Sequence, residues 1–316
     1  MLAVQPTAPH QLPMTASMSH SGHTVKVRVT PPSSSPSSPT GFGHPLSSAS
    51  SSQRKLDEPS FCHCEIRSHS AAADEAPFLR KTIELSDLAE IYRTPGLFEV
   101  LFRRVLRSPT PAMLAQLFNE ETKREGLACL QHIRMLDLGA GNGLLAQQFR
   151  ELGVGYVRGI DAMPEAKLAA DRDRPEVFDG YDVLPSFAAS AKTEGPSSPL
   201  GEVSLEPDSF NLLTCASSVG PDDLPPRAFT SAYNLLAPDA WIAFTLRDTF
   251  LGGRDTSGFA LFIGRCQRAG IMEVKAHQRF RHMIEPDGKS TYCIAFVAKK
   301  VKNISLRWLD LSAVSP

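Results

Sequence analysis

The chain has 316 residues, of which 33 are Lys or Arg and 34 are Asp or Glu, so its formal net charge is −1. No long basic stripe is present, and the electrostatic pattern typical of nucleic-acid-binding proteins is therefore missing. No segment approaches the roughly 18 consecutive apolar residues of a membrane-spanning helix. The composition predicts one large folded domain or two small ones, with no membrane association.

Residues 1–76 differ from the rest of the chain because Ser, Pro, His and Thr dominate them. Within them, the segment 31–40 has only Ser, Pro and Thr, and such a stretch cannot bury enough surface to offset its chain entropy. We therefore predict a disordered arm over residues 1–76. A Ser-rich, acid-poor amino terminus is also typical of an organelle transit peptide. The expected compartment is the cytoplasm, with a mitochondrion or plastid as the alternative.

Two cysteines and a histidine in this arm, Cys62, His63 and Cys64, have the spacing of half a zinc site. Zinc sites of this kind need a second pair of ligands at a similar spacing, and the sequence offers none. The pattern instead predicts free thiols in a flexible segment of a reducing compartment.

From Leu85 onward, apolar residues recur at helical spacing, so we expect a folded domain over residues 77–300, followed by a tail at 301–316. Thr94-Pro95 and Thr110-Pro111 each resemble an N-cap followed by proline in the first helical turn. Two or three helices are therefore expected ahead of the first strand.

The segment 133–143 changes from an apolar run to a turn with Gly139, Gly141 and Gly143 at alternate positions. Glycines between a strand and a helix allow positive φ and let a ligand approach the backbone closely. The helix that follows offers unpaired N–H groups and the positive end of its dipole. Asp137, at the end of the strand, would repel a pyrophosphate but suits a cationic or hydroxyl-bearing ligand. We infer a binding site for a nucleotide-like or amino-acid-like ligand.

Two further acidic residues follow predicted strands. Asp161 ends the strand at 156–160 and stands 18 positions after Gly143, close to the roughly 20 expected for the side chain that binds ribose hydroxyls. Asp182 follows a weaker strand at 177–181 and is placed to accept a hydrogen bond from an adenine amino group. Asp179 is the rival for that role.

The remaining chain alternates between strand-like and helix-like segments, with a polar surface insertion expected at 188–207. Strands are predicted at 210–215, 241–246, 274–280 and 292–298, and helices at 225–236 and 257–269. The turn at 286–288 predicts that the last two strands are antiparallel. Strands alternating with helices predict a doubly wound parallel sheet whose ligand lies at the carboxyl ends of the strands.

The order of these motifs, from Asp137 to Val297, resembles the class I S-adenosylmethionine-dependent methyltransferases. The segment from Tyr92 to Pro95, together with 136–139 and 159–161, is also similar to methyltransferase-like proteins of the Williams-Beuren region type. The resemblance implies an α/β, Rossmann-like, doubly wound seven-stranded sheet with an antiparallel last strand pair and extra N-terminal helices. It also implies a methyl transfer by in-line displacement, with S-adenosylmethionine as the cofactor.

The resemblance further implies which residues hold the cofactor. The glycine turn would hold the methionine part, Asp161 the ribose and Asp182 the adenine amino group, with Cys215 and Ala216 as the floor of the pocket. Tyr92, in a helical lid, would close over the methionine part; the alternative is that it is only a core anchor. The full set of implied cofactor-binding residues is Tyr92, Asp137, Gly139, Ala140, Gly141, Gly143, Asp161, Ala162, Asp182, Val183, Cys215 and Ala216.

The methyl acceptor is not identified by the sequence. The Asn-Pro-Pro-Tyr tetrad of many amino-group methyltransferases is absent, because the fourth strand continues as Cys215-Ala216-Ser217-Ser218. A small molecule or a protein is therefore a better acceptor than DNA. No catalytic residue is assigned, and the candidates for a general base are His277, His282, Asp222 and Asp223.

Two alternatives belong to other functional classes. A nicotinamide-dependent oxidoreductase is disfavoured by Asp137 and by the glycine spacing. A catalytically silent module that binds the cofactor, or serves only for interaction, would leave the same motifs in place.

Overall fold

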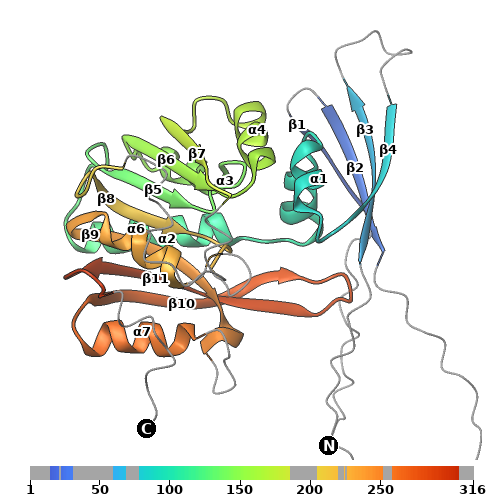
Figure 1. Ribbon diagram of the computed structural model, residues 1–316. Helices are drawn as coiled ribbons and strands as arrows, with labels where there is room; N and C mark the ends of the chain where they lie inside the picture. The colour runs from blue at the N-terminus through green and yellow to red at the C-terminus, as the bar shows by residue number, and fades with distance from the viewer. Residues whose placement is uncertain are drawn as a thin grey trace, which may run out of the picture.

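The computed structural model describes residues 15–20, 23–30, 60–68, 78–185, 205–219, 224, 226–251 and 258–305. Two sheets, of four and seven strands, make up its β-structure. Figure 1 shows them side by side, with helix α1 (Leu88–Arg93) between them.

The larger sheet contains β5 (Arg134–Leu138), β6 (Tyr156–Asp161), β7 (Gly180–Val183), β8 (Phe210–Cys215), β9 (Leu236–Arg247), β10 (Met272–Ile284) and β11 (Ser290–Lys300). Its strand order is β10-β11-β9-β8-β5-β6-β7. The pairs from β9 to β7 are parallel, whereas β11 is antiparallel to both β9 and β10. The order reverses between β5 and β8, which is where ligands bind in doubly wound sheets. The predicted fold class is confirmed, although the strand expected at 177–181 begins only at Gly180.

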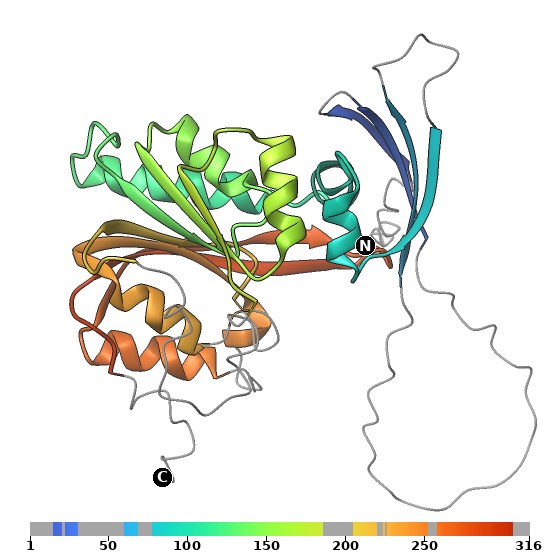
Figure 2. The same ribbon diagram turned by 45° about the horizontal axis from the view of Figure 1, so that its top comes forward.

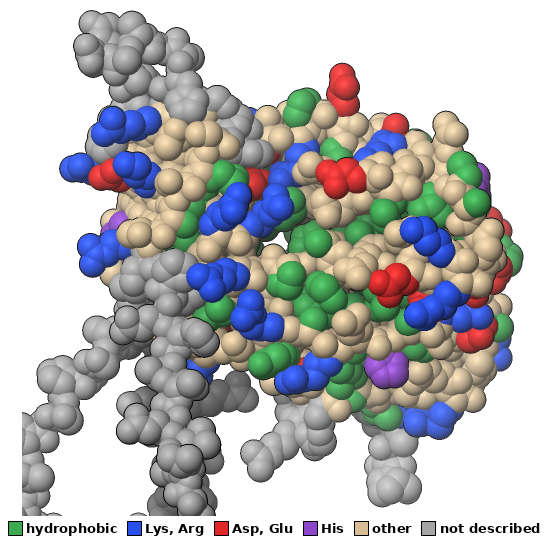
Figure 3. Space-filling view, turned by 180° about the vertical axis from the view of Figure 1, so that it is seen from behind, with side chains coloured by type: hydrophobic (Ala, Val, Ile, Leu, Met, Phe, Trp, Pro, Cys, Tyr) green, Lys and Arg blue, Asp and Glu red, His purple; other side chains and the backbone are tan. Residues whose placement is uncertain are grey.

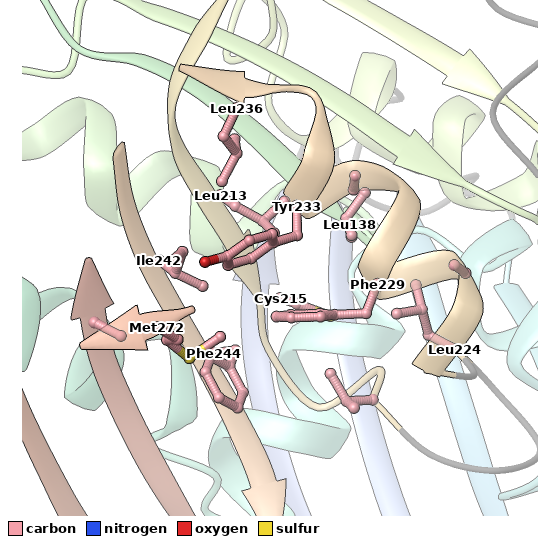
Figure 4. Packing of buried hydrophobic residues seen from close by; sticks show 14 of the residues in the cluster. Leu138, Leu213, Cys215, Leu224, Phe229, Tyr233, Leu236, Ile242, Phe244 and Met272 are labelled. Carbon is pink, nitrogen blue, oxygen red and sulfur yellow. The ribbon is translucent and has the colours of Figure 1, made fainter. Parts of the chain in front are cut away.

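Helices cover both faces of this sheet (Figure 2). One face carries α2 (Thr110–Arg124), α3 (Leu144–Glu151) and α4 (Pro164–Asp173), and the other carries α6 (Pro226–Asn234) and α7 (Phe259–Arg268). Figure 4 shows Phe229 and Tyr233 of α6 lying over Leu213, Ile242 and Phe244 of the strands. Because both faces are buried, β8 and β9 have nearly continuous apolar sequences.

The smaller sheet is an antiparallel meander of β1 (Thr15–His20), β2 (His23–Thr30), β3 (Phe61–Ser68) and β4 (Phe78–Glu84). Its inner face is apolar and buries Val25, Val27 and Val29 of β2 beside Cys62 and Cys64 of β3. The prediction of a disordered arm is therefore wrong for 15–20, 23–30 and 61–68, and the two thiols are core residues of a strand. The other parts of the arm lie outside the described residues.

The physical reason is that β2 alternates apolar and polar residues, which suits a strand with one buried face. The helical segment that follows β4 covers that face, since Ile91, Leu97, Val100 and Leu101 pack in the same cluster. The average composition of the arm concealed this local pattern.

The segment after α1 also differs from the prediction. Thr94 does not cap a new helix, because its hydroxyl donates to the carbonyl oxygen of Glu90 at 2.9 Å and ends α1. The following turns form a π-helix, η1 (Glu99–Val105). Such π-helical turns are rare and frequently occur at functional sites.

The outer face of the smaller sheet is polar. Lys26, Arg28, Arg67 and Arg80 are exposed on it, and Figure 3 shows Lys and Arg side chains gathered at this end of the molecule. A hollow of about 940 Å³ lies on this face, which is turned away from the larger sheet. Among the described residues, no helix is both long and apolar enough to cross a membrane.

Candidate functional site

The glycine turn between β5 and α3 consists of backbone in the left-handed region. Gly139, Gly141 and Gly143 have φ values of 65°, 54° and 81°, which residues with a Cβ adopt only under strain. A Cβ on Gly139 would lie 2.2 Å from Oγ of Ser218, and one on Gly141 would lie 2.8 Å from the hydroxyl of Tyr92. The glycines adopt the positive φ values that the sequence predicted, and the absence of a Cβ lets Ser218 and Tyr92 pack closely against the backbone of the turn.

Asp161, at the end of β6, faces this turn. Its two carboxylate oxygens accept hydrogen bonds from the backbone N–H groups of Gly141 and Met163, each at 2.9 Å. The residue is only 9% exposed, and this burial raises its pKa above the usual range. Each oxygen keeps a further lone pair, so the carboxylate can still accept from a hydroxyl-bearing ligand.

Asp137 lies within β5 and is 1% exposed. The hydroxyl of Thr214 donates to its Oδ1 at 2.6 Å, whereas its Oδ2 has no hydrogen-bond partner among the described residues. Burial raises the pKa of this carboxyl group to about 7. A buried carboxylate with one unsatisfied oxygen favours a cationic or hydrogen-bond-donating partner.

Tyr92 of α1 closes the turn from the other side. Its hydroxyl lies over Gly141, and its ring stacks on Phe98 with a centroid separation of 5.2 Å. Phe98 in turn contacts Phe102 at 4.5 Å. Burial, together with the charges of Asp161 and Glu99, raises the pKa of Tyr92. A row of three aromatic rings therefore leads away from the glycine turn along η1.

Tyr181 of β7 also contacts the turn, although no sequence motif pointed to it. Its hydroxyl donates to the carbonyl oxygen of Gly141 at 2.8 Å, and its ring packs over the bare backbone of Gly159. In register, Tyr181 pairs with Gly159, so it shares a sheet face with Asp161. The available signal was its position one residue before Asp182, which places an aromatic ring on the site side of the strand.

Asp182 does not join these residues. It pairs in register with Ile160 and therefore projects from the other face of the sheet. There its carboxylate accepts two hydrogen bonds from Arg158, at 2.6 and 3.1 Å. The rival, Asp179, accepts from the backbone N–H of Val157 at 2.7 Å. Val183, by contrast, is the register partner of Asp161 at the carboxyl edge of the sheet.

The end of β8 completes the site. Cys215 is buried, and Ala216 leads into Ser217, whose φ is 60° and whose N–H donates to the hydroxyl of Thr245 at 2.9 Å. The hydroxyl of Ser218 then donates to the carbonyl oxygens of Ala216 and Gly139, at 3.1 and 3.4 Å. Ser218 thus places this segment next to the glycine turn, whereas the side chain of Cys215 packs in the core beside Phe229 of α6 (Figure 4).

Two other predicted residues lie close by. Ala140 is buried inside the turn, and its Cβ lies 2.9 Å from a Cβ placed on Gly159. Ala162 is half-buried directly after Asp161. Both are small residues at the carboxyl edge of the sheet, where bulk would obstruct a ligand.

The candidate bases lie apart from these contacts. His282 is buried, and its Nδ1 shares a hydrogen bond of 2.8 Å with the hydroxyl of Thr110. Burial, with a further effect from Arg247, lowers the pKa of His282 to about 4. His277 is exposed and stacks on Phe296 at 6.0 Å. The other two candidates, Asp222 and Asp223, lie outside the described residues.

Comparison with known proteins gives a consistent result. A family model described as a methyltransferase domain matches residues 107–291, which is more than half of the chain. A ubiquinone biosynthesis O-methyltransferase of Burkholderia pseudomallei is 21% identical over 184 residues, covering 58% of this chain and 68% of that protein. The same-named protein of Neisseria meningitidis is 30% identical over 121 residues, covering 38% and 47%.

Among solved structures, an S-adenosylmethionine-dependent methyltransferase from Mesorhizobium loti aligns with a TM-score of 0.39 and 15% identity, covering 56% of this chain and 95% of that one. The fold follows from the strand order itself, and the alternative of a nicotinamide-dependent oxidoreductase is overturned by the family match. The chain belongs to the class I S-adenosylmethionine-dependent methyltransferases.

Proposed function

We propose that this enzyme transfers the methyl group of S-adenosylmethionine to a small-molecule acceptor. The observation that carries the proposal is the bare glycine turn held between two buried carboxylates, Asp137 and Asp161. The relatives named as ubiquinone biosynthesis O-methyltransferases support a small-molecule acceptor.

The described residues fit this cofactor. The unsatisfied Oδ2 of Asp137 suits the ammonium group of the methionine part. Asp161 would accept from the ribose hydroxyls, while Val183 and Ala162 would pack on the adenine ring. Asp182 does not belong to this proposed set, because Arg158 already holds its carboxylate.

When bound, the cofactor supplies an electrophilic methyl group, so the protein needs chiefly to align the acceptor with it. Tyr92 lies over the turn, and the partly buried rings of Phe98 and Phe102 continue outward from it. These rings would form an apolar wall for the acceptor on the side of η1.

Titration calorimetry with the demethylated cofactor, S-adenosylhomocysteine, tests the proposal. We expect the wild type to bind it and Asp161→Ala to bind much more weakly. Each charge-assisted hydrogen bond lost costs about 1.5–3 kcal/mol, or roughly 10- to 150-fold in affinity. Asp161→Asn keeps one acceptor oxygen and should fall between the two. Absence of binding to the wild type, or equal binding to Asp161→Ala, would contradict the proposal.

Methyl transfer itself is measured by incubating the protein with labelled cofactor and a small-molecule extract. Label should appear in an extracted small molecule and be absent with Asp161→Ala. A wild type that binds the cofactor but labels nothing would favour the catalytically silent alternative.

A further inference from the structure

A buried polar cluster joins η1 to the glycine turn. Its members are Glu99 of η1, Asn142 of the turn and Arg174, which directly follows α4. Glu99 and Asn142 are each 1% exposed, and Arg174 is 8% exposed. Oε1 of Glu99 accepts from Nδ2 of Asn142 at 2.7 Å and lies 2.8 Å from Nη1 of Arg174. Arg174 also donates to the backbone carbonyl of Asn142 at 3.1 Å.

This arrangement opposes separation of the three elements. A buried carboxylate that leaves its guanidinium partner becomes an unpaired charge at low dielectric, which is strongly unfavourable. Separating η1 from the turn would therefore leave Glu99 or Arg174 as an unpaired buried charge. The end of α4 strengthens the connection, because Arg172 donates to the backbone carbonyl of Tyr92 at 3.0 Å.

In the chain, Glu99 lies between Phe98 and Phe102, the two outer rings of the aromatic row. It directly follows Phe98 and precedes Phe102 by three residues, so its position fixes both rings that continue the aromatic row from Tyr92. On the other side, Asn142 stands between Gly141 and Gly143 in the turn.

We propose that Glu99 is a positioning residue that couples the glycine turn to the acceptor-side rings of η1 through Asn142 and Arg174. In this role, a cofactor bound at the turn stabilises the acceptor wall on η1 although the cofactor does not contact that wall. The effect of the cofactor on the acceptor wall rests on the proposed function, but the coupling between the two segments is a property of the protein alone.

Hydrogen exchange measured by mass spectrometry on the full chain without ligand tests the coupling directly. Glu99→Gln removes the charge but keeps the shape of the side chain. We expect roughly fivefold or greater acceleration of exchange in both 97–107 and 139–147. The matched control is Glu121→Gln in α2, another buried glutamate paired with an arginine, Arg124. It should leave both segments unchanged.

A second variant guards against misfolding of the first. Asn142→Ala removes the 2.7 Å hydrogen bond but leaves the ion pair of Glu99 with Arg174, so it should accelerate exchange in 97–107 although the change lies in the turn. Acceleration confined to the mutated segment in both variants would overturn the proposal, as would equal effects of Glu121→Gln.

The same exchange experiment with ligand present distinguishes this inference from the proposed function. With S-adenosylhomocysteine, the wild type should gain protection in both segments, whereas Glu99→Gln should gain it only in 139–147. Protection of both segments in Glu99→Gln would overturn the coupling. If the wild type failed to bind, the proposed function would fail, and the ligand-free comparison would still decide the role of Glu99.

Discussion

Asp137 is a carboxyl group whose burial opposes its own ionisation. Its pKa of about 7 in the folded chain exceeds the value of about 3.9 expected when it is unfolded. The folded state therefore holds the proton more tightly, and the free energy of unfolding falls as the pH rises from about 4 to about 7. The unliganded protein carries this cost at neutral pH, and a cationic ligand would offset it.

We predict that Asp137→Asn makes the unliganded protein more stable than the wild type at pH 8, with the difference vanishing near pH 4. Denaturant titrations at several pH values measure it. The lowered pKa of His282, about 4, has the opposite effect, because it makes the folded protein less stable as the pH falls below 6.5. The quantity to compare is therefore the difference in free energy of unfolding between the wild type and Asp137→Asn. The same variant should weaken binding of S-adenosylhomocysteine at pH 8 and abolish the tightening expected as the pH rises through 7. A variant less stable than the wild type at pH 8 would contradict this account.

Gly139 combines two reasons for being glycine, its positive φ and the hydroxyl of Ser218 at 2.2 Å from its Cβ position. We predict that Gly139→Ala lowers the free energy of unfolding by about 2–4 kcal/mol, since left-handed backbone costs about 1–2 kcal/mol and the clash adds to it. Gly153 is the matched control, with φ of 96° and open space around its Cβ position. Gly153→Ala should cost only the backbone strain, and equal losses in urea titrations would show that the contact with Ser218 is unimportant.

Some residues of the candidate site could be predicted from the sequence and others could not, and the reason is physical. Glycines and Asp161 follow from spacing along one strand-turn-helix-strand unit, where local geometry fixes distance. Tyr181 and Glu99 reach the turn from segments about 40 residues away in the chain. Their contacts depend on strand register and helix packing, which no local pattern specifies. Asp182 lies on the other face of the sheet because register, not proximity to a strand end, decides the face on which a side chain lies.

At the level of elements, β2 shows how a strong local pattern was overlooked. Val25, Val27 and Val29 alternate with Lys26 and Arg28, and the alternation alone predicts a half-buried strand. Its partner β3 lies more than 30 residues further along, so no hairpin signal joins the two. The helices and strands of the larger sheet were easier to predict because each is followed directly by its neighbour in a repeating unit.

Neighbouring residues of β2 provide a test of this element. Val27 is buried and Arg28 is exposed on the opposite face. We predict that Val27→Asn destabilises the protein by about 2–4 kcal/mol, because a polar amide replaces a buried apolar side chain. Arg28→Asn should change stability by no more than about 0.5 kcal/mol. Thermal unfolding of both variants checks this, and similar melting temperatures would mean that β2 does not pack as described.

On the scale of the whole molecule, the two sheets share one layer of helical structure. The π-helix η1 packs on the smaller sheet with Val100, Leu101 and Val105, while Glu99 binds the glycine turn of the larger one. The N–H of Ile284 in β10 donates to the carbonyl of Leu106 at 2.9 Å. A chain beginning near residue 77 would lose three strands and expose the apolar face of η1, so we expect the N-terminal part to contribute to folding.

This shared layer predicts that both sheets unfold together. The cysteines report on it, because Cys62 and Cys64 are buried in the smaller sheet, and Cys266 and Cys293 in the larger domain. Burial raises the pKa of Cys62 and of Cys293 to about 12, which keeps both thiols unreactive while folded. We expect pulse labelling with iodoacetamide across a urea series to give one midpoint for all four. Exposed Cys129 should react throughout and calibrates the label.

The same experiment on Val27→Asn makes the prediction sharper. If η1 couples the sheets, the loss of packing at Val27 should shift the midpoints of Cys266 and Cys293 by the same amount as those of Cys62 and Cys64, because cooperative unfolding shares the cost over the whole structure. Labelling of Cys62 and Cys64 at lower urea, with Cys266 and Cys293 unshifted, would instead establish the smaller sheet as an independent folding unit. In that case the acceptor wall on η1 would be able to open without unfolding the cofactor site.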